Sequence, residues 1–136
     1  MGNKTFWLGF VVVYVLWQAM GYLVHEVLLA DTYAALAHIW RPEADMMSMM
    51  WIMFVTSAVY LLLFCYIFTK GWEGRGVMEG ARYGLLMGLF LMVPAAFDAF
   101  VVYPITLNLA LIWLATGLIQ FVIVGVAFAA IYKPAR

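Results

Sequence analysis

The stretch that decides the fold runs from residue 107 to residue 132 and reads LNLALIWLATGLIQFVIVGVAFAAIY, without a single charged side chain. A helix needs about 20 predominantly apolar residues to cross the hydrocarbon core of a bilayer. Three further stretches, approximately 5–29, 46–68 and 81–103, are also long and predominantly apolar. We therefore predict four transmembrane spans over these ranges.

The composition of the chain supports this prediction and excludes other classes of protein. Of its 136 residues, 68% are hydrophobic and 10% are charged, and seven basic residues balance seven acidic ones. Soluble domains are about 45–50% apolar and about 25% charged. The high apolar content and the balanced charge of this chain therefore exclude a soluble domain, a disordered chain and a nucleic-acid-binding protein with a basic face. Continuous rather than alternating apolar runs favour helices over a membrane barrel. We predict an all-α integral membrane protein, a four-helix transmembrane bundle with one domain over residues 1–136.

Basic residues predict the orientation of this bundle. The positive-inside rule places Lys and Arg on the cytoplasmic side of the membrane. Arg41 stands alone on one side of the predicted spans. The other side carries Lys4, Lys70, Arg75, Arg82, Lys133 and Arg136. We predict that both termini are cytoplasmic and that the membrane is the inner membrane of a bacterium.

The connection between the first two spans predicts a short helix lying in the outer interface. Tyr33, Leu36, Ala37 and Trp40 fall on one face at helical spacing. Asp31 is suited to the N-cap of this helix. Pro42 ends it and opens the second span. The connection around Pro104 is very short, so the third and fourth spans are expected to be antiparallel neighbours.

A glycine pattern in the third span predicts close helix packing. Gly80, Gly84 and Gly88 form two overlapping small-xxx-small motifs, which let a neighbouring backbone approach. Leu91, Ala95 and Asp98 continue the same face at helical spacing. Helix packing is the favoured interpretation, and a groove for a flat ligand or a lipid is the alternative.

Deep polar residues in the first and fourth spans predict contacts between helices. Gln18 and Gly21 share a face of the first span with His25, and Thr116 and Gln120 share a face of the fourth. Polar side chains that face lipid are costly, so both faces should meet other helices. Gln18 and Gln120 both lie deep in the membrane and are expected to hydrogen-bond across helices.

The clearest candidates for chemistry are His25, Glu26 and Asp98, with His38 above them on the outer side. An ionisable side chain at the depth of Asp98 is a functional-site hypothesis by default. Three interpretations compete: a polar clasp between the first and third spans, a metal site that suits zinc, and a path for protons or substrate.

A methionine stripe opens the second span. Met46, Met49, Met50 and Met53 lie within about 100° of arc on a helix. Thioethers are soft ligands for Cu(I), and they are also adaptable packing surface, which is the favoured interpretation. The stripe, together with the glycine motif, resembles the methionine motifs of high-affinity copper transporters. The resemblance implies copper handling, but that family has three spans and this chain has four.

No set of residues typical of an enzyme active site is present, so we predict no catalytic residue. The leading functional hypothesis is a non-enzymatic accessory or scaffold subunit, which associates with other membrane subunits or with copies of itself and is surrounded by lipids. The first alternative is a small transporter or a protein that handles copper or zinc as its metal ion. The second is a quinone- or lipid-binding membrane module or enzyme. Nucleic acid is not an expected partner.

Overall fold

The computed structural model describes residues 3–134, and within this range the regular structure is entirely helical. Arg136, one of the basic residues counted above, lies outside it. The elements are α1 (Lys4–Tyr22), the π-helix η1 (Leu23–Leu28), α2 (Ala30–Ala35), the 3₁₀ turn η2 (Ala37–Ile39), α3 (Glu43–Lys70), α4 (Val77–Val102) and α5 (Leu107–Ile131).

Four helices are long and apolar enough to span a membrane, as the sequence predicted. They cover Lys4–Leu28, Glu43–Lys70, Val77–Val102 and Leu107–Ile131. The second and third begin three to four residues before the predicted spans, at Glu43 instead of 46 and at Val77 instead of 81. Apolarity alone misses these first turns because they carry acidic side chains, which are favourable at a helix N-terminus.

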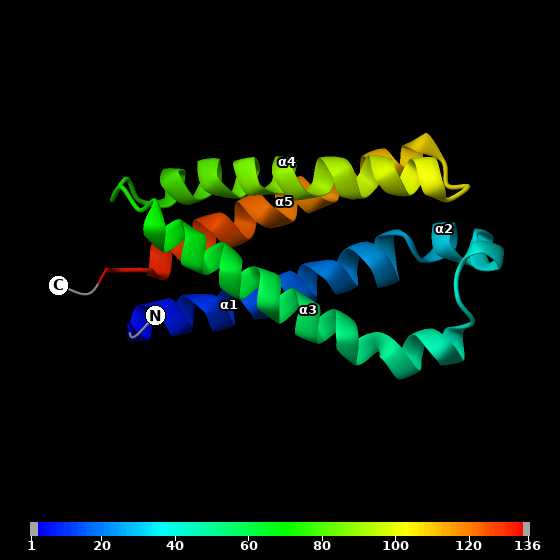
Figure 1. The fold of residues 1–136 in the computed structure, drawn as a ribbon, viewed down its shortest axis with the longest axis horizontal. Coiled ribbons are helices and arrows are strands. Elements are labelled where there is room, and N and C mark those ends of the chain that lie inside the picture. Colours follow the sequence, from blue (N-terminus) through cyan, green and yellow to red (C-terminus); the bar gives the residue numbers. More distant parts are fainter. Residues whose placement is uncertain (1–2, 135–136) are drawn as a thin grey trace.

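The long helices run side by side, with both chain termini at one end of the bundle and α2 at the other (Figure 1). We refer to these as the terminal end and the α2 end. Helix α5 packs against α4 over the most extensive interface and against α1 over the next largest. Helix α3 packs mainly on α1 and diverges from α4 and α5 toward the α2 end (Figure 1). The predicted antiparallel pairing of the last two helices is confirmed.

The α4–α5 interface is a contact of backbone against backbone. A Cβ atom at Gly80 would overlap the Gly125 carbonyl, and one at Gly84 would overlap the Phe121 carbonyl. Gly88 lies against the side chains of Leu118 and Phe121. The predicted close packing at all three glycines is therefore present in the structure.

The continuation of this glycine face differs from the prediction. Ala96 is buried and Met92 half-buried, whereas Leu91, Ala95 and Asp98 are exposed. Helices that approach this closely align their rows of every fourth residue, so the buried row follows 80, 84, 88, 92 and 96. The predicted row advanced by three residues, instead of four, at Leu91 and again at Asp98. These shorter steps place the predicted residues outside the α4–α5 interface.

The main core lies toward the terminal end and is rich in aromatic side chains. Phe6 packs edge-on against Phe128, and Phe68 packs edge-on against the same ring. Aromatic pairs in this geometry contribute about 0.5–1.5 kcal/mol beyond their buried area. The buried members of this core are Phe6, Val13, Leu61, Phe64, Cys65, Phe68, Phe121, Val124 and Phe128.

The loop between α3 and α4 is organised by one buried carboxylate. The side chain of Glu79 is only 6% exposed and accepts hydrogen bonds from the backbone N–H groups of Glu73 (2.6 Å) and Arg75 (2.8 Å). Gly74 and Gly76 adopt positive φ angles of 77° and 73°, which favour glycine. The sequence analysis did not single out this carboxylate.

The region between the first two spans is a helical turn and a 3₁₀ turn rather than one amphipathic helix. The N-cap of α2 is Leu29, and Asp31 lies in the first turn, so the predicted N-cap is wrong. Pro42 is the N-cap of α3. Three of the four predicted face residues, Tyr33, Leu36 and Trp40, pack against a second cluster formed by Leu29, Ile105, Leu109 and Ala110, whereas Ala37 is exposed.

Candidate functional site

A hydrogen-bonded group of three side chains joins η1, α2 and α5 at the α2 end. The indole Nε1 of Trp113 donates to the hydroxyl oxygen of Tyr33 at 2.8 Å. The same hydroxyl lies 2.6 Å from Nδ1 of His25. The His25 and Tyr33 rings are nearly parallel, at 12° between their planes. This network fixes the imidazole from one side.

The element that carries His25 is unusual. Residues 23–28 form a π-helix, in which the backbone N–H of Leu29 bonds to the carbonyl of Val24 at 2.9 Å, five residues earlier. Single π-turns within α-helices are rare and often occur at functional sites. The extra residue rotates the end of the first span, so that the residues after the turn no longer follow the helical register of α1.

Next to His25 is a pocket of about 150 Å³ between η1, α4 and α5. Its lining is mostly apolar, with small residues on both α4 and α5. The residues that line it are His25, Met92, Ala95, Ala96, Trp113, Thr116, Gly117 and Gln120. No residue of α3 lines this pocket.

Gln120 is the exceptional member of the lining. Its side chain is 7% exposed, and its amide nitrogen Nε2 is buried without a hydrogen-bond partner within residues 3–134. A buried donor without a partner costs about 1–3 kcal/mol. Thr116, one turn earlier, donates its hydroxyl hydrogen to the backbone carbonyl of Ile112 at 2.7 Å. Gln120 and His25 are therefore the side chains in this pocket that keep a nitrogen without a hydrogen bond within the described residues.

The two deep glutamines have different surroundings. Gln18 donates from Nε2 to the hydroxyl of Ser57 on α3 at 2.7 Å, whereas Gln120 lines the pocket. Gln18 thus joins α1 to α3, as a polar contact between helices was expected to do. Gly21, predicted at a packing face, has no atom within 4 Å of the position that a Cβ would occupy. It makes no close helix contact within the described chain.

The predicted polar cluster on the α2 side does not assemble. Glu26, His38 and Asp98 are exposed, and His25 is bound to Tyr33 rather than to Asp98. Over residues 3–134, no three His, Cys, Asp or Glu side chains gather in a way that could hold a metal ion. The prediction relied on the approximate height of each residue along its helix, which does not fix the direction in which a side chain points.

The methionine stripe lies on the part of α3 that diverges from the bundle. Met46 and Met53 are 40% and 68% exposed, and Met49 and Met50 are half-buried. The stripe therefore does not pack into the core of this chain. Neighbouring large side chains, including Trp51 and Phe54, are exposed as well.

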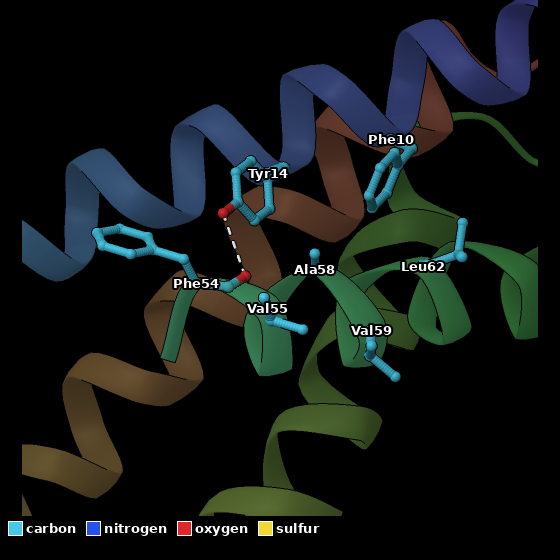
Figure 2. Close-up of a pocket in the computed structure, with 7 residues that line it drawn as sticks. All are labelled: Phe10, Tyr14, Phe54, Val55, Ala58, Val59 and Leu62. Atoms are coloured by element: carbon cyan, nitrogen blue, oxygen red, sulfur yellow. Dashed lines mark hydrogen bonds between the residues drawn. The ribbon is translucent and has the colours of Figure 1, made fainter. Parts of the chain in front are cut away.

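A second pocket, wider and apolar, lies where α1 and α3 cross (Figure 2). It has a volume of about 350 Å³ and is lined by Phe10, Tyr14, Phe54, Val55, Ala58, Val59 and Leu62. The Tyr14 hydroxyl donates to the carbonyl of Phe54 at 3.2 Å, so the one polar side chain in this lining is already bonded. This groove presents hydrocarbon and offers no group for chemistry.

Two residues of the site, Tyr33 and Trp113, were not among the predicted site residues. Both combine an aromatic ring with one polar atom, which usually finds a partner when it is buried. This preference was the signal in the sequence that could have identified the two residues. Because they lie far apart in the chain, no local pattern predicts that they contact each other. Comparison of the chain with family models, with curated proteins and with solved structures finds no match.

Proposed function

We propose that this chain is an integral membrane protein that binds a small lipophilic molecule in the pocket between η1, α4 and α5. Four long apolar helices support membrane insertion. The distribution of basic residues supports a bacterial inner membrane with cytoplasmic termini. In that orientation the pocket lies toward the outer leaflet, where a lipophilic ligand reaches it from the bilayer.

The observation that carries this proposal is the buried, unpartnered amide of Gln120. An apolar side chain of similar size would avoid the cost of leaving this donor without a partner. Binding pockets are typically apolar with a few polar groups that orient the ligand, and this pocket has that character. We infer that the ligand carries a hydrogen-bond acceptor for Gln120 and an apolar body that fits beside Met92 and Ala96.

The test is a comparison of the wild type with Gln120→Leu. Both proteins are purified from native membranes in mild detergent, and their bound molecules are extracted into organic solvent and identified by mass spectrometry. We expect a stoichiometric lipophilic compound in the wild type and a loss of most of it in Gln120→Leu. In ligand-free protein, Gln120→Leu should increase the free energy of unfolding by about 1–3 kcal/mol, because it removes the unpartnered donor.

Two further variants sharpen this test. A Cβ at Gly117 would meet the flexible end of Met92, so Gly117→Ala should push Met92 into the pocket and reduce ligand content. Gly21→Ala is the matched control, because that position is open. Equal ligand content in all four proteins, or no bound compound in the wild type combined with a destabilised Gln120→Leu, contradicts the proposal.

A second candidate function is that of an accessory subunit of a larger membrane complex. It is supported by the part of α3 nearest the α2 end, where Met46, Trp51 and Met53 are exposed on a helix that has left the bundle. Met and Trp are enriched at protein interfaces. Native mass spectrometry of the protein from its own membranes tests this candidate. We expect other chains on the 15.4 kDa protomer, and a lone protomer contradicts it.

A further inference from the structure

The pocket between η1, α4 and α5 holds two hydrogen-bond donors that come from different helices. We propose that it selects a flat ring with two carbonyl acceptors on opposite sides, which is the chemistry of a quinone head group. This inference rests on the ligand-binding function proposed above and specifies the class of ligand.

The first donor is the amide of Gln120 on α5. Gln120 lines the pocket, and its Nε2 is buried and has no partner within the described residues. An amide nitrogen donates and does not accept. The ligand atom that it meets must therefore be an acceptor, such as a carbonyl oxygen.

The second donor is the imidazole of His25. Because the indole of Trp113 can only donate, the Tyr33 oxygen accepts from it. We assign the Tyr33 hydroxyl hydrogen to the bond with Nδ1 of His25, which the hydroxyl can donate while it accepts from Trp113. Burial raises the pKa of Tyr33 above its ordinary value, so the phenol keeps this hydrogen at neutral pH. With Nδ1 as acceptor, the neutral imidazole carries its own hydrogen on Nε2. This nitrogen has no hydrogen bond within residues 3–134 and is free to donate to a ligand.

The two donors stand at different levels of the pocket. Trp113 fixes the Tyr33–His25 pair at one level, and Gln120 lies two turns further along α5, about 10 Å away along the helix axis. Ala95, Ala96 and Gly117 line the pocket with little side-chain bulk. A cavity of this size accepts a benzene-sized ring. A ring with one acceptor would leave one donor unpaired, whereas a ring with two opposed carbonyls pairs both.

The experiment compares three probes of one ring system that differ in their number of acceptors: dimethylnaphthoquinone, tetralone and naphthalene. The full chain is placed in lipid nanodiscs after its endogenous ligand has been washed out. Binding is measured by quenching of tryptophan fluorescence and by competition with the extracted native ligand. The infrared carbonyl stretches of the bound quinone report whether each oxygen accepts a hydrogen bond.

We expect the quinone to bind about tenfold more tightly than tetralone, which corresponds to one additional hydrogen bond. Both of its carbonyl stretches should shift to lower frequency on binding. Equal affinity of quinone and tetralone would overturn the two-acceptor inference while leaving the proposed function standing. Failure of all three probes to compete with an identified native ligand would also overturn the inference, and the absence of any native ligand would remove the proposed function as well.

Variants assign the two donors. Gln120→Leu and His25→Phe should each weaken quinone binding about tenfold, and each should return one carbonyl stretch to its unbound frequency. Tyr33→Phe removes the group that sets the His25 tautomer and should affect the same carbonyl as His25→Phe. Tyr22→Phe, at an exposed tyrosine, is the control that should leave binding unchanged. If none of these substitutions changes either carbonyl stretch of the bound quinone, the assignment of Gln120 and His25 as the two donors is contradicted.

Discussion

At the scale of single residues, the glycines of this chain have very different roles. Gly84 sits where a Cβ would overlap the backbone of Phe121, while Gly21 faces open space. A methyl group at Gly84 cannot be accommodated by a side-chain shift, because the atoms it meets belong to the backbone. Replacement of glycine by alanine can therefore be compared at a position where the methyl group overlaps backbone and at one where it meets no atom.

We expect Gly84→Ala to lower the free energy of unfolding by about 2 kcal/mol or more, because it forces α4 away from α5. Gly21→Ala should raise it by about 0.5–1 kcal/mol, because alanine loses less conformational freedom in a helix. Thermal unfolding in one detergent, followed by circular dichroism, measures both. Two variants of equal stability would contradict the packing described for α4 and α5.

Single residues also show why the sequence predicted the packing better than the site. The glycines repeat every four residues on one helix, so their common face follows from local geometry. The hydrogen-bond partner of His25 depends on a π-turn, which no pattern in the sequence predicts. The partner, Tyr33, lies eight residues away in a different element. Gln120 was recognised as deep and polar, but its lack of a partner depends on the rotation of three helices.

At the scale of elements, α1 and α3 are joined by few polar contacts. One of them is the hydrogen bond from Gln18 to Ser57. Gln18 follows Tyr14 by one turn and Ser57 precedes Ala58, and Tyr14 and Ala58 both line the apolar groove of Figure 2. Because α3 has little contact with α4, this bond and the aromatic core position α3 on the bundle.

We expect a double-mutant cycle of Gln18→Leu and Ser57→Ala to give a coupling energy of about 0.6–1.7 kcal/mol, the range of polar contacts between membrane helices. Unfolding in mixed micelles supplies the four free energies. Gln18→Leu combined with Thr56→Ala is the control pair, because the Thr56 hydroxyl bonds to the carbonyl of Ile52 on its own helix. A coupling no larger than in this control pair contradicts the proposed contact.

In the α2 region, the sequence predicted which residues share a face but not where the helix is interrupted. The spacing of Tyr33, Leu36 and Trp40 correctly predicted that they share a face, and all three pack on the same cluster. The prediction of one continuous helix was wrong, because the backbone at Leu36 leaves the helical conformation with φ −102° and ψ 16°. Tertiary packing of short segments outweighs their weak intrinsic preference for a single helix.

At the scale of the whole molecule, the asymmetry of basic residues predicts the orientation. Lys4 begins α1, Arg75 lies in the loop between α3 and α4, and Lys133 follows α5, whereas Arg41 lies in the connection between α2 and α3. The first three positions belong to the terminal end of the bundle and the last to the α2 end (Figure 1). We expect a reporter fused after Lys133 to be active on the cytoplasmic side only, and a reporter inserted near Arg41 to be active on the periplasmic side only. Replacing Lys70, Arg75 and Arg82 together should produce a mixed orientation. The opposite reporter pattern in the unaltered chain would reverse the side from which we expect the pocket to be reached.

The packing of α1 has a consequence for the order of assembly during synthesis. Its largest partner is α5, which is synthesised after the other described helices, and residues Asn3 and Thr5 at the start of α1 hydrogen-bond to the carbonyl of Lys133. Helix α1 therefore remains without its main neighbour until α5 has been translated. Helices α4 and α5 are adjacent in the chain, so they are expected to pair first as a local hairpin. A nascent chain that stalls before residue 107 would lack the largest packing partner of α1.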